Sequence, residues 1–296
     1  MSNQHRTTSQ SARRPWKTIQ NWVYWLDNPD LGQIGASNFE LAVIDYSADG
    51  SAQKAFTREQ IEELRTSRSR RVVSYLSIGQ AESYRGYWQQ HWKTGSPSWL
   101  GSPDPEWDRN YWVLFWDPSW QDVIYRYVDG ILAAGFDGIY LDRIDAYEEE
   151  YAQGHEHDMV RFVTTLADYA RARSPLGEDF GIIVQNAESL ASRYPEYVRL
   201  VTGIGREETY VYATNQPTSN EARIDIERNL DIFRCHSRGH LVLTVDYATK
   251  KNLIRTAYKR AYAKGYVPYV TDVRLNQLQI NHGYEPVCHP IGYEDQ

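Results

Sequence analysis

The chain has 296 residues, of which 41% are hydrophobic and 24% charged, a composition typical of a globular protein with one large α/β domain or two small ones. Its 32 basic and 39 acidic residues give a net charge of -7, which argues against a nucleic-acid-binding surface because such a surface normally carries a basic stripe. No apolar run approaches the length of a transmembrane helix.

The first 17 residues predict a flexible tail. They include Arg6, Arg13 and Arg14 but no acid, and they lack the apolar core of a secretory signal. We therefore expect one folded domain over residues 18–296, in a protein that is either cytoplasmic or separated from its export signal.

Apolar runs with the length of buried parallel strands alternate with amphipathic segments along the chain. The strand-like runs cover residues 22–26, 41–45, 72–77, 138–142, 181–185, 201–205, 241–246 and 267–271. Helices are expected after an N-cap at Thr57, from Pro118 to a stop at Gly135, and over 155–173, 189–199, 221–237 and 250–264. Eight strand–helix units in about 250 residues predict a single-domain α/β fold, the (β/α)8 TIM barrel. A doubly wound open sheet competes with it, but the first strand lacks the G-x-G-x-x-G phosphate turn.

The longest irregular segment, at about 80–111, follows the third strand and contains four tryptophans among Gly, Ser and Pro. Loops of this length are usually functional or disordered, and the tryptophans argue for order. We expect the run 112–117 to add a ninth strand outside the barrel.

The aromatic content is unusual, with 10 Trp and 23 Tyr but only 7 Phe. Trp and Tyr carry polar atoms that need partners when buried, whereas flat rings with a polar edge suit sugar faces. A Tyr-rich core and surface is the simpler explanation for more than half of these rings, and a sugar-binding groove is the functional one.

The carboxyl ends of the eight strands would place one ring of side chains at the barrel mouth, where catalytic groups of this fold lie. Together with neighbouring positions on the same strands, the ring supplies the residues expected to contact substrate, which are Trp25, Asp45, Tyr46, Tyr75, Tyr140, Asp145, Asn186, Arg206, Glu208, Asp246 and Tyr247. The ring contains no His, which counts against Ser-His-Asp chemistry and a His-based metal site.

Asp142 and Glu207 are the predicted catalytic pair, with Glu208 as the alternative second acid. Their strands are separated by one strand, so both carboxyl groups can point into one cleft. Paired carboxylates across a groove are what glycoside hydrolysis requires, because one must donate a proton while the other attacks or activates water. The structural alternative is that acids at strand ends only cap the helices that follow. This alternative fits Asp27 and Asp117 better than it fits Glu207.

Two other functions fit the same ring. A non-catalytic carbohydrate-binding barrel would use the aromatic cleft alone. A metal-dependent hydrolase would use Asp45, Asp142, Glu207 and Asp246 as oxygen ligands. The leading hypothesis needs no metal or cofactor, and no P-loop or other phosphate-cradling pattern is present. Cys235 and Cys288 are the only cysteines; they have no zinc spacing, and a single bridge between them is possible.

Four motifs together resemble glycoside hydrolase family 114, the endo-α-1,4-polygalactosaminidases. They are VSYLSIGQAESYR at 73–85, GIYLDRID at 138–145, QNA at 185–187 and GREE at 205–208, and the similarity extends from about Trp22 to Asp272. Members active on this polymer carry Asn-Glu-Gln-Cys after the sixth strand, where this chain has Arg206 to Thr209, and the chain looks closer to a bacterial and archaeal branch.

The resemblance implies a metal-independent glycosidase that acts on an α-1,4-linked amino-sugar polymer, with Asp142 and Glu207 as the two acids. It also matches Tyr75, Glu82 and Arg85 to the third-strand pattern, with Glu82 lining or bracing the cleft. We favour a retaining mechanism in which Asp142 is the nucleophile and Glu207 the general acid/base. Members of the family are usually exported.

Overall fold

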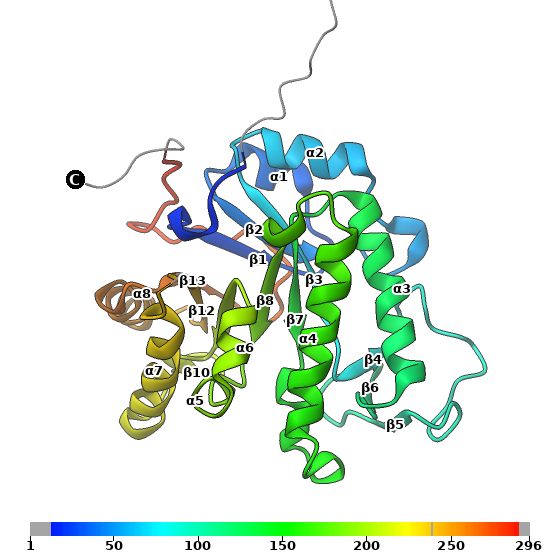
Figure 1. Cartoon of the computed structure of the whole chain (residues 1–296). Coiled ribbons are helices and arrows are strands. Elements are labelled where there is room, and N and C mark those ends of the chain that lie inside the picture. The colour runs from blue at the N-terminus through cyan, green and yellow to red at the C-terminus, as the bar shows by residue number, and fades with distance from the viewer. Residues whose placement is uncertain (1–12, 238, 290–296) are drawn as a thin grey trace, which may run out of the picture.

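The computed structural model describes residues 13–237 and 239–289, and eight parallel strands form its central sheet. In hydrogen-bonded order they are β1 (Trp22–Trp25), β2 (Leu41–Asp45), β3 (Arg71–Ser77), β7 (Gly138–Asp142), β8 (Gly181–Gln185), β9 (Gly203–Glu207), β12 (Leu241–Tyr247) and β13 (Val267–Thr271). The sheet curls into a nearly closed barrel, in which the Trp22 indole of β1 donates a hydrogen bond to the Val267 carbonyl of β13 at 2.9 Å. The predicted (β/α)8 barrel is confirmed (Figure 1).

Helices pack around the barrel as α1 (Leu31–Ala36), α2 (Arg58–Thr66), α3 (Pro118–Ala134), α4 (Glu156–Arg173), α5 (Leu190–Arg193), α6 (Pro195–Leu200), α7 (Asn220–Arg234) and α8 (Lys251–Lys264). Thr57 caps α2 as predicted, and Gly135 ends α3 with a φ of 83°. The helix expected over 189–199 is instead two short ones, because Pro195 keeps Tyr194 out of the helical conformation. None of the helices in the described residues is long and apolar enough to cross a membrane.

The insertion after β3 is ordered. It contributes β4 (Gln80–Glu82), β5 (Leu100–Pro103) and β6 (Asn110–Val113), which pair as a separate antiparallel sheet. Trp92 contacts both Trp88 and Trp99 with ring centroids 5.4 and 4.9 Å apart. A strand outside the barrel is therefore present as β6, but it ends at Val113, and the rest of the expected run 112–117 is a turn that leads into α3. Figure 1 shows this sheet at the lower end of the barrel, opposite the terminal segments.

The tail prediction is wrong for residues 13–17, while residues 1–12 lie outside the described residues. Arg14 is buried and forms an ion pair with Glu40 at 3.1 Å, and Arg13 pairs with Asp137 at 2.7 Å. The Trp16 ring lies under the Arg71 guanidinium, 4.5 Å from it. Buried charges persist where they are paired, so this segment closes the amino end of the barrel.

The strand expected over 201–205 begins two residues later, at Gly203. Val201 is the C-cap of α6 and its amide donates to the Tyr197 carbonyl, so the strand cannot begin there. The Thr202 amide already donates to the Ile182 carbonyl of β8, at 2.7 Å. The shift brings Arg206 and Glu207 into β9, where successive side chains point to opposite faces.

Aromatic rings fill the barrel interior, which accounts for much of the Tyr and Trp excess. Trp22, Tyr24 and Tyr140 are fully buried, and the ring of Tyr24 lies 5.6 Å from that of Trp22 and 5.3 Å from that of Tyr140. A Cβ atom on Gly205 would lie 1.9 Å from the Tyr140 hydroxyl, so only glycine fits beside this ring. Cys235 and Cys288 are both free, and the considered bridge is not formed.

Candidate active site

Three neighbouring strands bring an acid, an amide and a second acid together at the barrel mouth. Asp142 ends β7, Gln185 ends β8 and Glu207 ends β9. Gln185 Nε2 donates to Asp142 Oδ1 and to Glu207 Oε2, at 2.8 Å in each case. The two carboxylate oxygens are consequently at most twice 2.8 Å, about 5.6 Å, apart. The Tyr24 hydroxyl donates to Gln185 Oε1 at 2.9 Å, which turns the amide nitrogen toward the acids.

Asp142 is surrounded by donors. The Tyr75 hydroxyl donates to Oδ2 at 2.6 Å and the Arg143 amide donates to Oδ1 at 2.7 Å. Arg143 adopts a left-handed conformation with φ 59°, which folds its amide back onto the carboxylate. Burial raises the pKa of Asp142, while the Arg143 charge and the Tyr75 hydrogen bond oppose the rise.

Glu207 has donors but also a negative neighbour. Tyr247 donates to Oε1 and Asn186 donates to Oε2, the latter at 3.2 Å. Burial raises the pKa of Glu207, the charge of Asp142 raises it further, and the bonds from Tyr247 and Asn186 lower it. The pKa of each acid is raised by burial. The charge of Arg143 stabilises the anion at Asp142, however, whereas the charge of Asp142 destabilises the anion at Glu207. The pair thus favours an ionised Asp142 beside a protonated Glu207.

The acids lie in a cleft that consists of two adjoining cavities. The first, of about 610 Å³, is lined by Asp142 and Glu207 and by seven residues predicted to contact substrate, namely Asp45, Tyr75, Glu82, Arg85, Asp145, Asn186 and Tyr247. The second, of about 640 Å³, is lined by Glu207 and by the predicted Arg206 and Glu208. The cavities share Trp107, Asp145, Asn186, Glu207, Tyr247 and Val273, so they lie side by side at the acid pair.

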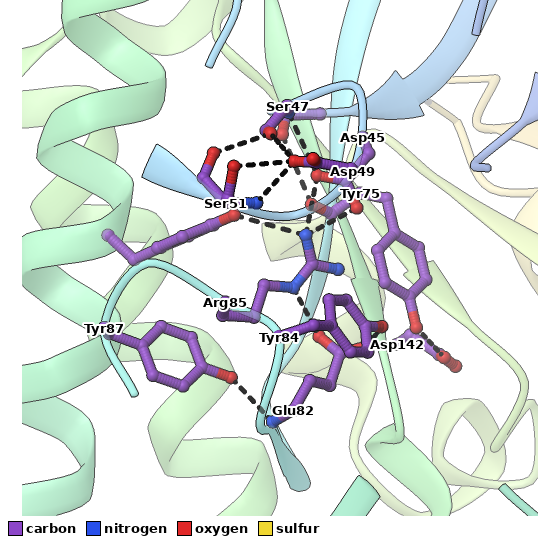
Figure 2. A network of polar contacts seen from close by, with 12 residues as sticks. Asp45, Ser47, Asp49, Ser51, Tyr75, Glu82, Tyr84, Arg85, Tyr87 and Asp142 are labelled. Atoms are coloured by element: carbon purple, nitrogen blue, oxygen red, sulfur yellow. Dashed lines mark hydrogen bonds and ion pairs between the residues drawn. The ribbon is translucent and has the colours of Figure 1, made fainter. Parts of the chain in front are cut away.

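A buried ionic network forms one wall of the first cavity. The Arg85 guanidinium donates to Asp45 Oδ1 at 2.6 Å and to Glu82 Oε2 at 2.7 Å (Figure 2). It also lies 5.7 Å from the centre of the Tyr75 ring, whose hydroxyl binds Asp142. The network therefore fixes β4, β2 and Tyr75, which donates to Asp142, relative to one another. This arrangement fits the bracing role expected of Glu82.

Four residues expected to contact substrate do not line either cavity. The Trp25 indole donates to the Asp27 carbonyl, the Tyr46 ring packs on Tyr127, and Tyr140 lies inside the barrel two residues before Asp142. Asp246 is buried and accepts the amides of Tyr210 and Val211 at 2.6 and 2.8 Å. Strand alternation explains two of these positions, because Tyr46 and Asp246 point away from the faces that carry Asp45 and Tyr247.

Several site residues received no role from the sequence. Gln185 was only the last residue of the strand predicted over 181–185, and its bridging of two acids depends on the pairing of three strands. Arg143 and Trp107 line the cleft because of loop conformations, and Tyr212 does so from a two-residue strand; no local pattern specifies either. For these residues, the only indication in the sequence is an aromatic or basic side chain close to the ring of strand-end residues at the barrel mouth.

The four acids of the metal-dependent alternative are not gathered at one point. Asp45 is paired with Arg85 and Asp246 with backbone amides, away from the Asp142–Glu207 pair. Within residues 13–237 and 239–289, no three His, Cys, Asp or Glu side chains are grouped to hold a metal ion.

Two carboxyl groups bridged by one amide at the mouth of a (β/α)8 barrel form the type of site found in glycosidases. The family model of glycoside hydrolase family GH114 matches residues 4–289, and the chain belongs to this family. It is accordingly a glycoside hydrolase with a carbohydrate substrate, as the sequence motifs predicted.

Relatives are found in bacteria and archaea. An uncharacterized protein of Deinococcus radiodurans is 38% identical over 279 residues, covering 93% of this chain and 87% of that protein. Another from Methanocaldococcus jannaschii is 36% identical over 273 residues, covering 87% of this chain and 77% of that protein.

Solved structures share the fold. Ega3 of Aspergillus fumigatus, in complex with galactosamine, matches with a TM-score of 0.67 at 18% identity, covering 89% of this chain and 94% of that one. The glycoside hydrolase domain of PelA from Pseudomonas aeruginosa matches with a TM-score of 0.66 at 15% identity, covering 88% of this chain and 97% of that one.

Proposed function

We propose that this glycoside hydrolase cleaves an α-1,4-linked galactosamine polymer with Asp142 and Glu207 as its two acids. The hydrogen bonds from Gln185 to both carboxylates carry the proposal, because they set the acids at the spacing of a glycosidase pair. Family membership supports the reaction class, and the galactosamine bound to Ega3 supports the sugar. The resemblance of the 138–145 and 205–208 motifs supports the choice of acids.

The proposed reaction retains the anomeric configuration. Asp142 attacks the anomeric carbon as Glu207 gives its proton to the leaving glycosidic oxygen, which forms a glycosyl–Asp142 ester and releases the leaving chain. Glu207, now ionised, takes a proton from water, and the water oxygen attacks the anomeric carbon and frees Asp142. A separation of at most about 5.6 Å matches retaining enzymes, whereas inverting enzymes need about 6.5–9.5 Å to admit water between the acids.

The two adjoining cavities support cleavage within the polymer. Glu207 lines both cavities, so a chain bound across it would extend on both sides of the bond that is broken. A site that accepted only chain ends would be closed on one side. We therefore assign endo cleavage to the enzyme.

The test is hydrolysis of galactosamine and N-acetylgalactosamine polymers, with products sized by mass and their first anomer identified by NMR. Asp142→Asn and Glu207→Gln should each lower kcat by about 10²–10⁴-fold, while Asp129→Asn, at an exposed position on α3, should not. Full activity in Asp142→Asn would reject the acid assignment. Tight binding without any product, in wild type and variants alike, would favour the carbohydrate-binding alternative.

A further inference from the structure

A third cavity lies between α3 and the insertion that follows β3, and neither Asp142 nor Glu207 lines it. We call it the outer cavity. Its volume of about 470 Å³ is within the range of sites that enclose small ligands. Its lining includes Tyr46, Tyr87, Trp92, Arg126, Tyr127 and Gly130.

Two elements supply the cavity wall opposite the insertion. Arg126, Tyr127 and Gly130 lie within about one turn of α3 and therefore share one face of that helix. Tyr46 directly follows Asp45 at the end of β2, so its side chain points away from the face that carries Asp45. Its ring packs against that of Tyr127 with centroids 5.3 Å apart. Tyr46, which was expected at the barrel mouth, thus lines the outer cavity instead.

Two rings of the outer cavity are fixed by the ionic network of the cleft wall. The Arg85 guanidinium donates to the Tyr127 hydroxyl at 3.2 Å, and the Glu82 amide donates to the Tyr87 hydroxyl at 2.9 Å (Figure 2). The rings of Tyr87 and Tyr127 meet edge to face, with centroids 5.5 Å apart. The cavity is therefore formed before a ligand arrives, which lowers the entropy cost of binding.

The outer cavity offers a cation and a hydroxyl but no carboxylate. No Asp or Glu is among the described residues that line it, whereas several acids line each cavity at the barrel mouth. Within residues 13–237 and 239–289, the exposed Arg126 has no ion-pair partner and the Tyr46 hydroxyl has no hydrogen-bond partner. This hydroxyl lies beside α3, only 3.1 Å from where a Cβ on Gly130 would be, one turn after Arg126. A guanidinium and a hydroxyl without partners suit a ligand that carries a carboxylate.

We propose that the outer cavity is a second carbohydrate-binding site, which binds a sugar whose ring carries a carboxylate, that is, a uronate. The carboxylate accepts hydrogen bonds from Arg126 and Tyr46, and the sugar ring packs against Trp92 and Tyr87. Membership of a glycoside hydrolase family favours a sugar as the ligand, and the charge of the lining favours an acidic one. The inference goes beyond the proposed function, because the site does not use the acid pair.

Galacturonate is the probe, and calorimetric titration of the wild-type protein gives its Kd. Galacturonamide, the uncharged amide of the same sugar, should bind about tenfold more weakly, because the charge-assisted hydrogen bonds are lost. Added salt should weaken the binding of galacturonate but not that of galacturonamide. Benzoate, a ring acid that is not a sugar, should bind more weakly than galacturonate.

Three substitutions locate the ligand. Arg126→Gln should raise the Kd of galacturonate about tenfold, and Tyr46→Phe should raise it about two- to tenfold. Gly130→Leu changes no charge but adds a side chain beside the Tyr46 hydroxyl, so it should raise the Kd at least about tenfold by filling the cavity. A helix interior accepts Leu better than Gly, and thermal unfolding checks that each variant is folded.

Matched controls remove a cation elsewhere. Arg109→Gln removes a cation that lines the first cavity, and Arg228→Gln removes an exposed cation on α7; neither should change the Kd. Galacturonate should also bind Asp142→Asn as tightly as wild type, so a failure of the proposed hydrolysis leaves this test unaffected.

Four results would overturn the outer cavity as a uronate site. They are the absence of measurable binding to the wild type, a Kd unaffected by Arg126→Gln and Gly130→Leu, loss of binding in Arg109→Gln, and benzoate binding as tight as that of galacturonate. The third result would place the ligand in the cleft, and the fourth would show that the cavity does not recognise a sugar.

Discussion

Asp142 and Glu207 share one hydrogen-bond donor, the Nε2 atom of Gln185, although they lie on strands that are not adjacent. The amide therefore does two things at once. It fixes the separation of the acids, and it partly neutralises the repulsion between them.

Replacing Gln185 by Leu should lower kcat by about 10²-fold while the fold is retained, because both carboxylates lose the group that positions them. Steady-state kinetics on galactosamine polymer and a thermal unfolding curve measure the two effects. A change confined to KM would mean that Gln185 only binds substrate and does not align the acids.

The two tyrosines that donate to the acids should move opposite limbs of the pH profile. Tyr247→Phe removes a bond that lowers the pKa of Glu207, so the proton is held to higher pH and the alkaline limb of kcat shifts upward. Tyr75→Phe removes a bond that lowers the pKa of Asp142, so ionisation of the nucleophile occurs later and the acid limb shifts upward. Because the acids are coupled, the limbs belong to the pair.

Profiles of kcat from pH 3 to pH 9 for wild type and both variants provide the measurement. If both substitutions moved the same limb, the assignment of nucleophile and general acid/base would have to be changed. An alkaline limb that moved down in Tyr247→Phe would contradict the sign derived from the hydrogen bond.

The sequence specified the barrel and its acid pair better than the walls of the cleft. Eight apolar runs were enough to predict the strands, and strand β9 begins later than predicted because Val201 still caps α6. Which member of Asp45–Tyr46 or Asp246–Tyr247 faces the mouth depends on register, and a shift of one residue reverses it. Trp107 lies on a loop and Tyr212 in the short strand β10 (Val211–Tyr212), and the position of β10 is fixed by distant contacts with Asp246.

The packing of Tyr140 inside the barrel can be tested, because its hydroxyl is buried with no hydrogen-bond partner among the described residues. Tyr140→Phe should keep full activity and leave the free energy of unfolding unchanged or raised by about 1 kcal/mol. Gly205→Ala should cost about 1–3 kcal/mol or more by overpacking. Because the new Cβ would meet the Tyr140 hydroxyl first, the double variant should recover part of this loss in urea unfolding. Simple additivity of the two changes would contradict the predicted contact.

The network around Arg85 predicts a large loss of stability. Arg85→Met leaves Asp45 and Glu82 as buried carboxylates without their cation, which should cost about 3–5 kcal/mol. Arg228→Met, which breaks an exposed ion pair with Asp225 on α7, should cost less than about 1 kcal/mol. Urea unfolding of the two variants compares them directly, and similar values would show that the buried network does not stabilise the cleft wall.

Asp145 should make the protein less stable as the pH rises. Burial, followed by the charge of Asp142, raises the pKa of Asp145 from an ordinary value of 3.8 to about 7 in the folded protein. The unfolded chain releases this proton near pH 4 and the folded chain near pH 7, so between these values the unfolded state is increasingly favoured. Below pH 4 the effect is absent, and above pH 7 it is complete.

Asp145→Asn removes this titration, so its stability relative to wild type should increase from pH 4 to pH 7 and then level off. Thermal unfolding at pH 4, 6 and 8 measures the trend, with Glu63→Gln as the control for loss of one negative charge at an exposed position. A stability difference that stayed constant from pH 4 to pH 8 would show that Asp145 is ionised at little cost in the folded protein.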